Sequence, residues 1–196
     1  MYVIYRISDN SYKKTKLPCC NKFICMENFI ECFSKIDLIV ADNCNQDTLE
    51  FIKNNKCNYV STNLGNAGSF IYALDCVLNL PNDEIVYFVE DDYLHNNNRS
   101  NLELVVRQGL SFSDYVTLYD HPDKYGANYD YGEICKVRYL DRLHWRSTIS
   151  TTMTFATTVK TIKEDKDIFE KICHNQFHPN DHQIFLELKN VKNTTI

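Results

Sequence analysis

The first half of the chain alternates short apolar segments with longer amphipathic ones, and this alternation limits the fold more than any other feature. Runs rich in β-branched and aromatic residues predict strands, and apolar residues at helical spacing predict helices. The predicted strands cover residues 3–7, 37–41, 57–61 and 85–89, and the predicted helices cover residues 22–35, 46–54 and 67–80. This order implies right-handed crossovers, so we predict an α/β fold with a mostly parallel central sheet and helices on both faces.

The second half follows the alternation less closely. We predict helices at residues 101–110, 161–173 and 181–189, a short strand at 115–118, and an edge or mixed strand at 150–157. Residues 119–143 are rich in tyrosine and aspartate, which suit sugar recognition about as well as they suit a plain surface loop. At 196 residues, of which 44% are hydrophobic, the chain is expected to form a single domain.

Polar residues follow each predicted strand of the first half. The four strand ends are residues 6–9, 42–43, 62–65 and 90–92. Ligands of parallel sheets bind outside the carboxyl ends of the strands, near the switch in strand order. The four segments are therefore predicted to converge on one crevice.

The fourth strand end carries three adjacent carboxylates, Glu90, Asp91 and Asp92. Adjacent carboxylates repel one another, so their clustering after a buried strand indicates a positive ligand. Hard, oxygen-seeking Mg²⁺ or Mn²⁺ with a phosphate-bearing molecule fits this chemistry. The alternative is a solvated acidic turn.

The segment after the third strand places Gly65 and Gly68 at the start of a helix. Free backbone N–H groups and the helix dipole favour an anion there, so a diphosphate could approach closely. The alternative is a tight turn that only starts the helix, because the segment matches neither the Rossmann glycine pattern nor a P-loop.

Charge and composition exclude several classes of function. A formal net charge of −5 argues against a protein that binds nucleic acid by neutralising phosphates. No apolar stretch approaches the roughly 20 residues of a membrane span, and no basic-then-apolar leader opens the sequence, so we expect a cytoplasmic protein without a transmembrane segment. The nine cysteines lack a repeated Cys-x-x-Cys spacing, so neither a zinc site nor a disulfide framework is expected.

With these motifs the sequence resembles the GT-A fold glycosyltransferases, which use nucleotide-sugar donors. The resemblance is strongest over residues 2–95, and small viral and bacterial members are the most similar in style. It implies a single glycosyltransferase domain over residues 1–196. Residues 1–95 would form its nucleotide-sugar and metal-binding half, and residues 96–196 its acceptor-binding half.

The resemblance also implies roles for residues at the strand ends. Tyr5 and Arg6 would open the nucleotide pocket, and Asp42 would contact the base. Asn63 and Gly65 match the family's segment after the third strand.

The acidic triplet matches the family's Asp-x-Asp metal motif. Glu90 stands where the family has its first Asp, and with Asp91 it would contact the nucleotide. Asp92, with Asp91, would hold Mn²⁺ or Mg²⁺. Many members complete the metal site with a late histidine, but no histidine follows His182 in this sequence. His182 or His178, a water molecule, or a residue outside this sequence would then fill that position.

Residues 178–182 resemble the family's late acidic motif, with Asn180 where a Glu is usual. The resemblance implies that Asp181 is the catalytic base, which deprotonates the acceptor hydroxyl if the reaction inverts the anomeric centre. For a retaining enzyme that role falls away, and Asp181 could equally be a helix N-cap. The single tryptophan, Trp145, is expected either under the acceptor or in the core or its rim.

Together these features predict a metal-dependent glycosyltransferase of the hexosyl or deoxyhexosyl type. It would transfer a sugar from a nucleoside-diphosphate sugar to a glycan or another hydroxyl acceptor. One alternative is a sugar-phosphate nucleotidyltransferase, although the expected glycine-rich basic signature after the first strand is missing. Another is a catalytically silent module that binds a nucleotide sugar.

Overall fold

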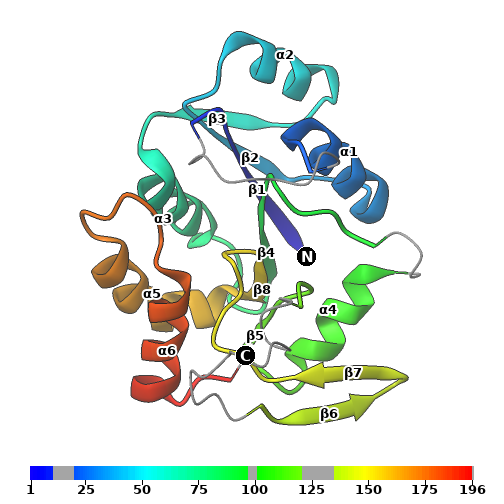
Figure 1. Cartoon of the computed structure of the whole chain (residues 1–196), viewed down its shortest axis with the longest axis vertical. Coiled ribbons are helices and arrows are strands. Elements are labelled where there is room, and N and C mark those ends of the chain that lie inside the picture. Colours follow the sequence, from blue (N-terminus) through cyan, green and yellow to red (C-terminus); the bar gives the residue numbers. More distant parts are fainter. Residues whose placement is uncertain (11–19, 97–100, 121–134, 196) are drawn as a thin grey trace.

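The computed structural model describes residues 1–10, 20–96, 101–120 and 135–195. One six-stranded sheet, in the order β3-β2-β1-β4-β8-β5, forms the centre of the molecule (Figure 1). A separate two-stranded hairpin consists of β6 and β7. The strands are β1 (Tyr2–Ser8), β2 (Leu38–Asp42), β3 (Tyr59–Thr62), β4 (Ile85–Glu90), β5 (Tyr115–Val116), β6 (Val137–Leu140), β7 (Leu143–Arg146) and β8 (Phe155–Thr158). The helices are α1 (Lys22–Phe33), α2 (Gln46–Asn54), α3 (Gly65–Val77), α4 (Leu102–Leu110), α5 (Val159–Cys173) and α6 (Asp181–Lys192).

The first four strands form the parallel part of the sheet, as the sequence predicts. β1 lies between β2 and β4 and pairs with both in parallel, and β2 pairs in parallel with β3. The register places Ser8 opposite Asp42 and Arg6 opposite Glu90. All four strands and the three helices between them lie within about two or three residues of their predicted positions, because their apolar runs are buried and leave a clear pattern.

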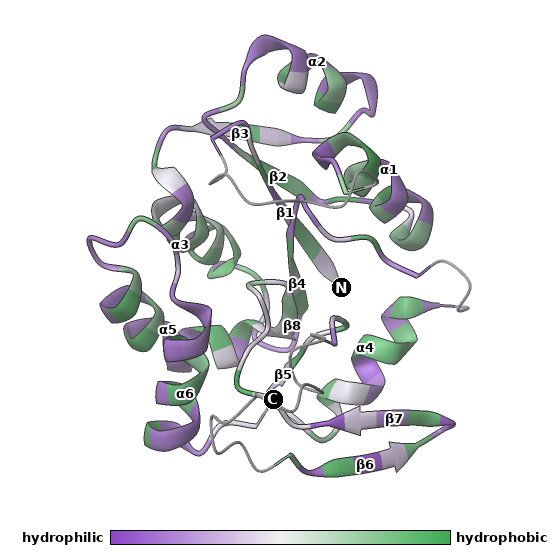
Figure 2. Ribbon diagram, in the orientation of Figure 1, coloured by the Kyte–Doolittle hydropathy of each residue, from purple (hydrophilic) through white to green (hydrophobic). Residues whose placement is uncertain are grey.

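Helices cover both faces of the sheet. Helices α3, α5 and α6 pack on one face around residues such as Phe70, Phe155 and Phe169, whereas α1 and α4 lie on the other face with Phe29 and Val106. Hydrophobic residues concentrate on the central strands, and hydrophilic residues on the outer parts of the helices (Figure 2). The mixed α/β fold and the mostly parallel sheet are therefore confirmed.

The second half adds strands to the same sheet. β8 is antiparallel to β4 and β5 and lies between them, so it is an interior strand and is shorter than the predicted strand over residues 150–157. Residues 150–154 instead form a loop, in which Thr152 and Met153 adopt left-handed backbone angles, with φ of 54° and 59°. No helix in the described part of the chain is long and apolar enough to cross a membrane.

Strand β6 of the hairpin lies inside residues 119–143, for which a surface loop is one expectation, and β7 begins at the end of that stretch. Three of the four residues of β6 are exposed, so this strand lacks the apolar alternation by which strands are recognised. The part of that stretch at residues 121–134 lies outside the described residues. The hairpin lies beside α4 in the view of Figure 1, at the end of the molecule opposite α2.

Candidate functional site

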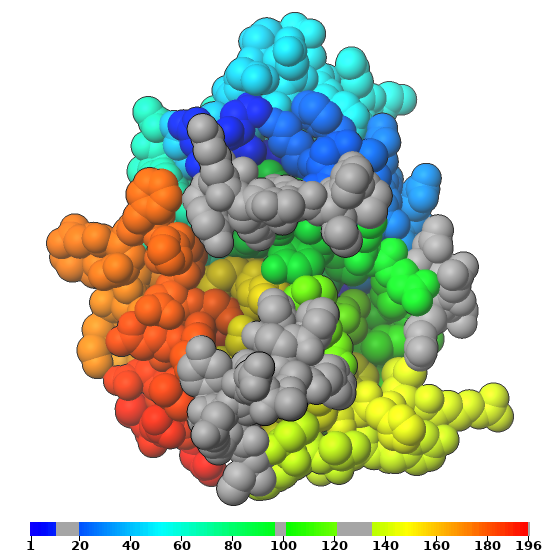
Figure 3. Space-filling model, in the orientation of Figure 1, coloured from blue at the N-terminus to red at the C-terminus, as the bar shows by residue number. Residues whose placement is uncertain are grey.

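The carboxyl ends of β1, β2, β3 and β4 lie at one edge of the sheet, as expected for parallel neighbours. The end of β4 and the loop before β8 meet at the centre of the face shown in Figure 3, coloured green and yellow to gold. This face also carries the blue N-terminal segment and the orange-red helices α5 and α6. The edge therefore joins both halves of the sequence.

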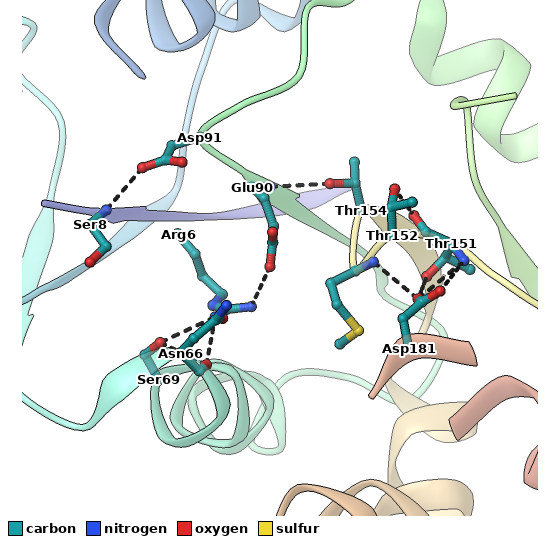
Figure 4. Close-up of polar contacts among 11 residues, drawn as sticks. Arg6, Ser8, Asn66, Ser69, Glu90, Asp91, Thr151, Thr152, Thr154 and Asp181 are labelled. Atoms are coloured by element: carbon teal, nitrogen blue, oxygen red, sulfur yellow. Dashed lines mark hydrogen bonds and ion pairs between the residues drawn. The ribbon is translucent and has the colours of Figure 1, made fainter. Parts of the chain in front are cut away.

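The carboxylates of Glu90, the last residue of β4, and of Asp91 point in different directions. Glu90 turns towards α3, where its Oε1 lies 2.9 Å from a terminal guanidinium nitrogen of Arg6. Asp91 turns the other way, and its Oδ2 accepts a hydrogen bond of 2.9 Å from the backbone N–H of Ser8 (Figure 4). Successive side chains of a strand alternate between faces, which separates these neighbours. Arg6 thereby offsets the charge of Glu90.

Arg6 connects three elements. Its side chain is almost fully buried, with 7% of the residue exposed. The second terminal nitrogen donates to the backbone oxygen of Asn66 at 2.7 Å, to the side-chain oxygen of Asn66, and to Ser69 Oγ at 3.2 Å. The guanidinium also lies over the ring of Phe70, 5.4 Å from its centroid. Arg6 thus fixes the first turn of α3 against β1 and β4, and the nucleotide-pocket role predicted for it would be indirect.

The first turn of α3 is open to an anion. Gly65, at its first position, has a φ of +74°, which a residue with a Cβ rarely adopts. A Cβ built there would meet no atom of the described residues within 4 Å, so the glycine serves the backbone angle and not a close contact. Leu64 occupies the N-cap position and offers no side-chain acceptor to the helix N–H groups. Asn63 is exposed beside them, so the predicted segment lies where a diphosphate could bind.

Asp42 holds the turn that leads into this loop. The residue is only 3% exposed. Its Oδ1 accepts from Thr62 Oγ1 at 2.8 Å and from the backbone N–H of Leu64 at 2.7 Å, and its Oδ2 accepts from the side chain of Asn43 at 2.7 Å. Three of the roughly four acceptor positions of the carboxylate are therefore used within the protein.

This geometry predicts a combined effect of Asp42→Ala. We expect the free energy of unfolding to fall by about 1–3 kcal/mol, because the groups that Asp42 satisfies lose their acceptor. For the nucleotide-sugar donor expected from the sequence, KM should rise with little change in kcat, because the loop would be needed equally in the ground state and the transition state. Thermal unfolding and initial-rate kinetics measure both effects, with Asp47→Ala on the exposed face of α2 as the matched control. Unchanged stability and an unchanged donor KM would show that the turn does not depend on Asp42.

Tyr5 lies in the core instead of the crevice. It is fully buried, and its ring packs edge-on against Phe29 with the centroids 5.6 Å apart. Burial raises the pKa of the Tyr5 hydroxyl well above its usual value, and the negative charge of Asp91 raises it further. The alternation of strand side chains puts Tyr5 on the face of the sheet that α1 covers and Arg6 on the face that α3 covers. Tyr5 therefore belongs to the hydrophobic core between the sheet and α1.

Asp181, the predicted base, is the first residue of α6, and Asn180 is the N-cap that accepts from the backbone N–H of Gln183. The alternative prediction that Asp181 is the cap is therefore wrong. Its carboxylate accepts hydrogen bonds from Ser150 Oγ at 2.5 Å, from the backbone and hydroxyl of Thr151 at 2.9 and 2.7 Å, and from the backbone N–H of Met153 at 3.1 Å. Asp181 thus stabilises the left-handed turn of the 150–154 loop.

The 150–154 loop links Asp181 to the end of β4. Thr154 Oγ1 accepts a hydrogen bond of 3.2 Å from the backbone N–H of Glu90. Figure 4 shows Glu90 between Arg6 on one side and Thr154 on the other, with Asp181 beyond the loop. No signal in the sequence pointed to Thr151 or Thr154, because their partners lie about 30 and 60 residues away.

The predicted metal ligands do not form a closed cluster. Within the described residues no group of three or more His, Cys, Asp or Glu side chains is arranged to hold a metal ion. His182 follows Asp181 on α6 and is partly buried. Mg²⁺ is usually held by one or two carboxylates together with substrate phosphates, so Asp91 and Asp92 are a donor set that suits such an ion once a diphosphate is present.

His95 anchors the segment that follows β4 to helix α1. The backbone N–H of His95 donates to Asn28 Oδ1 at 2.6 Å, and the backbone oxygen of His95 accepts from Asn28 Nδ2 at 3.1 Å, which ties the segment to α1. The ring packs edge-on against Phe29 and Phe33, and its Nε2 lies 2.7 Å from the hydroxyl of Tyr87. Burial lowers the pKa of His95 to about 4.

This burial predicts a dependence of stability on pH. The unfolded chain, whose histidine has an ordinary pKa, binds more protons than the folded chain between about pH 6.5 and 4. The free energy of unfolding should therefore fall as the pH is lowered through this window, by up to about 3 kcal/mol from His95 alone. Urea unfolding at several pH values measures the slope, and His95→Gln should be less pH-dependent than the wild type. Equal slopes in the two proteins would contradict the prediction.

Comparison with known proteins identifies a shared fold. No family model and no curated protein matches the chain. Among solved structures, the crystal structure of S. aureus TarS 1-349 matches with a TM-score of 0.52 and 14% sequence identity, over 94% of this chain and 54% of that chain. The chain shares its fold with TarS. It spans about half the length of the TarS structure, and at this identity the likeness describes the fold and not individual residues.

Proposed function

We propose that the protein is a metal-dependent glycosyltransferase of the GT-A fold. It would transfer a sugar from a nucleoside-diphosphate sugar to a hydroxyl group of a glycan or another acceptor. The observation that carries the proposal is the arrangement around Arg6. This residue binds Glu90 at the acidic strand end and Asn66 in the first turn of α3, so the acidic strand end and a helix start that could bind an anion lie beside each other. The shared fold supports the proposal, because TarS is a glycosyltransferase.

Each part of this arrangement has a role in binding the donor. The N–H groups at the start of α3 would donate hydrogen bonds to the diphosphate, and Gly65 would let it approach the backbone closely. Asp42 holds the turn in front of this helix, so the nucleotide would lie over a loop that is already ordered. Arg6 keeps Glu90 and the first turn of α3 at a fixed separation, which reduces the rearrangement needed on binding.

Asp92, together with Asp91, would hold Mn²⁺ or Mg²⁺. When bound, the ion would offset the negative charge that develops on the leaving diphosphate. Asp91 is oriented by the backbone N–H of Ser8, which fixes one of its oxygens at the end of β1. The acidic strand end would thus supply hard oxygen donors at the same edge of the sheet as the start of α3.

Asp181 would accept the proton of the acceptor hydroxyl in an inverting reaction. The 150–154 loop donates hydrogen bonds to its carboxylate, so the carboxylate is already oriented. The same hydrogen bonds use some of the acceptor positions of its oxygens. Asp181 therefore combines a structural role with the proposed chemical one.

A binding screen tests the donor part of the proposal. Thermal unfolding is measured with uridine, guanosine and thymidine diphosphate sugars, with and without Mn²⁺. One base should raise the unfolding temperature, and Mn²⁺ should enlarge the shift, because ligands that bind only the folded state stabilise it by mass action. If no nucleotide sugar changes the unfolding temperature in either condition, the strand-end edge is not a donor site.

A further inference from the structure

A second site lies next to the proposed donor site. A cavity of about 530 Å³ is enclosed by the chain after β4, the chain after β5, α4 and strand β7. Its volume falls within the range of about 300–1,000 Å³ that is usual for small-molecule sites. Residues of its wall that the argument uses are Tyr93, His95, Tyr119, Asp120, Trp145 and Arg146.

The cavity borders the acidic strand end. Tyr93 follows Asp92 directly in the chain, and Thr154, which also lines the cavity, accepts a hydrogen bond from the backbone N–H of Glu90. A molecule in the cavity would therefore lie next to the end of β4, which carries the proposed metal ligands. This position suits the second substrate of a transfer reaction.

The wall combines aromatic rings with fixed polar groups. Tyr93 and Tyr119 pack edge-on with their centroids 4.9 Å apart, and the indole of Trp145 packs against Phe112 at 5.7 Å. Asp120 accepts from two guanidinium nitrogens of Arg146, at 2.8 and 2.5 Å, so these two opposite charges offset each other. Aromatic faces suit the C–H face of a sugar ring, and paired donors and acceptors suit its hydroxyl groups.

Two residues of the wall bury a nitrogen that has no protein partner. The indole Nε1 of Trp145 and the ring Nδ1 of His95 are buried without a hydrogen-bond partner in the described chain. His95 is at least nine-tenths buried, and its low pKa keeps the ring neutral at ordinary pH. Both side chains line the cavity, and a buried polar group without a partner costs free energy.

Trp145 is held in place by α4. A Cβ at Gly109 would lie 3.0 Å from the six-membered ring of Trp145 and 2.5 Å from Val116, so only glycine lets the helix approach this closely. The ring is therefore positioned at the wall before any ligand arrives. Such preorganisation reduces the cost of binding.

From these observations we propose that the cavity binds an uncharged pyranose ring, the terminal sugar of the acceptor. That this sugar belongs to the acceptor rests on the proposed glycosyltransferase function, whereas the binding of a pyranose rests on the cavity alone. Trp145 and Tyr119 provide the aromatic wall, and Asp120 and Arg146 provide fixed polar groups for the hydroxyls.

The single tryptophan of the chain makes the test direct, because its fluorescence reports on this cavity alone. The wild-type protein is titrated with the methyl glycosides of glucose, galactose, mannose and N-acetylglucosamine, without a nucleotide. We expect a saturable change in emission with at least one of them. Tyr119→Leu should weaken this binding about tenfold, the effect of losing about 1.4 kcal/mol of aromatic contact. Tyr139→Leu is the control, because Tyr139 lies on β6 outside the cavity wall and is 64% exposed.

The outcomes separate this proposal from the proposed function. A saturable change that Tyr119→Leu weakens and Tyr139→Leu leaves intact supports a pyranose site. If no glycoside changes the emission although a nucleotide sugar binds with Mn²⁺, the cavity proposal is overturned and the donor site stands. Equal weakening by the two variants, or a glycoside signal that a nucleotide sugar abolishes by competition, would also overturn it.

Discussion

Asp92→Asn is expected to lower turnover at least ~100-fold and to weaken metal-dependent donor binding. The substitution keeps the shape of the side chain but removes the charge that attracts the cation. A bound metal ion supplies several kcal/mol of charge stabilisation in the transition state, which sets the size of the loss. Product formation measures the first effect, and calorimetric titration of a nucleoside diphosphate with and without Mn²⁺ measures the second.

Asp83→Asn is the matched control for this experiment. Asp83 is exposed and precedes β4, so the same chemical change falls at the opposite end of the strand that carries Asp92. The control should retain wild-type turnover and wild-type binding. Full activity of Asp92→Asn, or full activity of the wild type after exhaustive chelation, would remove the metal ion from the mechanism.

Asp181→Asn is expected to reduce sugar transfer by ~10²–10⁴-fold, the usual contribution of a general base. Donor binding should stay intact, because Asp181 lies beyond the 150–154 loop from Arg6 and Glu90. An asparagine keeps one oxygen in place, so it can still accept from Thr151 and Met153, whereas its amide group can donate to Ser150. The folded loop should therefore survive a change that removes the base.

Comparison with Asp181→Ala separates chemistry from structure. Alanine removes all the hydrogen bonds of the carboxylate, so this variant should also lose stability, by about 1–3 kcal/mol. Asp47→Asn, in the first turn of α2, is the control for a neutral residue at a helix start. Near-normal transfer by Asp181→Asn together with impaired transfer by Asp181→Ala would assign Asp181 to positioning of the loop. A product that retains the donor's anomeric configuration would also exclude the role of base.

The parallel half of the sheet could be predicted because its strands carry their signal locally. A strand that is buried on both faces needs an unbroken apolar run, and Ile85 to Val89 is such a run. The hairpin of β6 and β7 could not be predicted, because residues such as Val137 and Tyr139 are exposed and their strand has no buried face to impose alternation. The loop before β8 alternates polar and apolar residues, which predicts a strand, but its hydrogen bonds to Asp181 hold it in a turn.

The location of the site at the strand ends follows from topology, but its side-chain arrangement follows from register. Adjacent residues of one strand point to opposite faces, which separates Tyr5 from Arg6 and Glu90 from Asp91. Arg6 binds Glu90 because the two residues are opposite each other in neighbouring strands, a fact that only the pairing of β1 and β4 reveals. Local sequence patterns contain no information of this kind.

The release of free nucleoside diphosphate tests the central claim most directly. The protein is incubated with a panel of nucleotide sugars and Mn²⁺, with and without methyl glycosides as acceptors, and the nucleotide products are separated by chromatography. The account predicts slow release of nucleoside diphosphate from at least one donor, accelerated by an acceptor and lost in Asp92→Asn. Formation of a nucleoside triphosphate and a sugar phosphate when pyrophosphate is added to the nucleotide sugar, or tight binding of a donor without any turnover, would contradict glycosyl transfer.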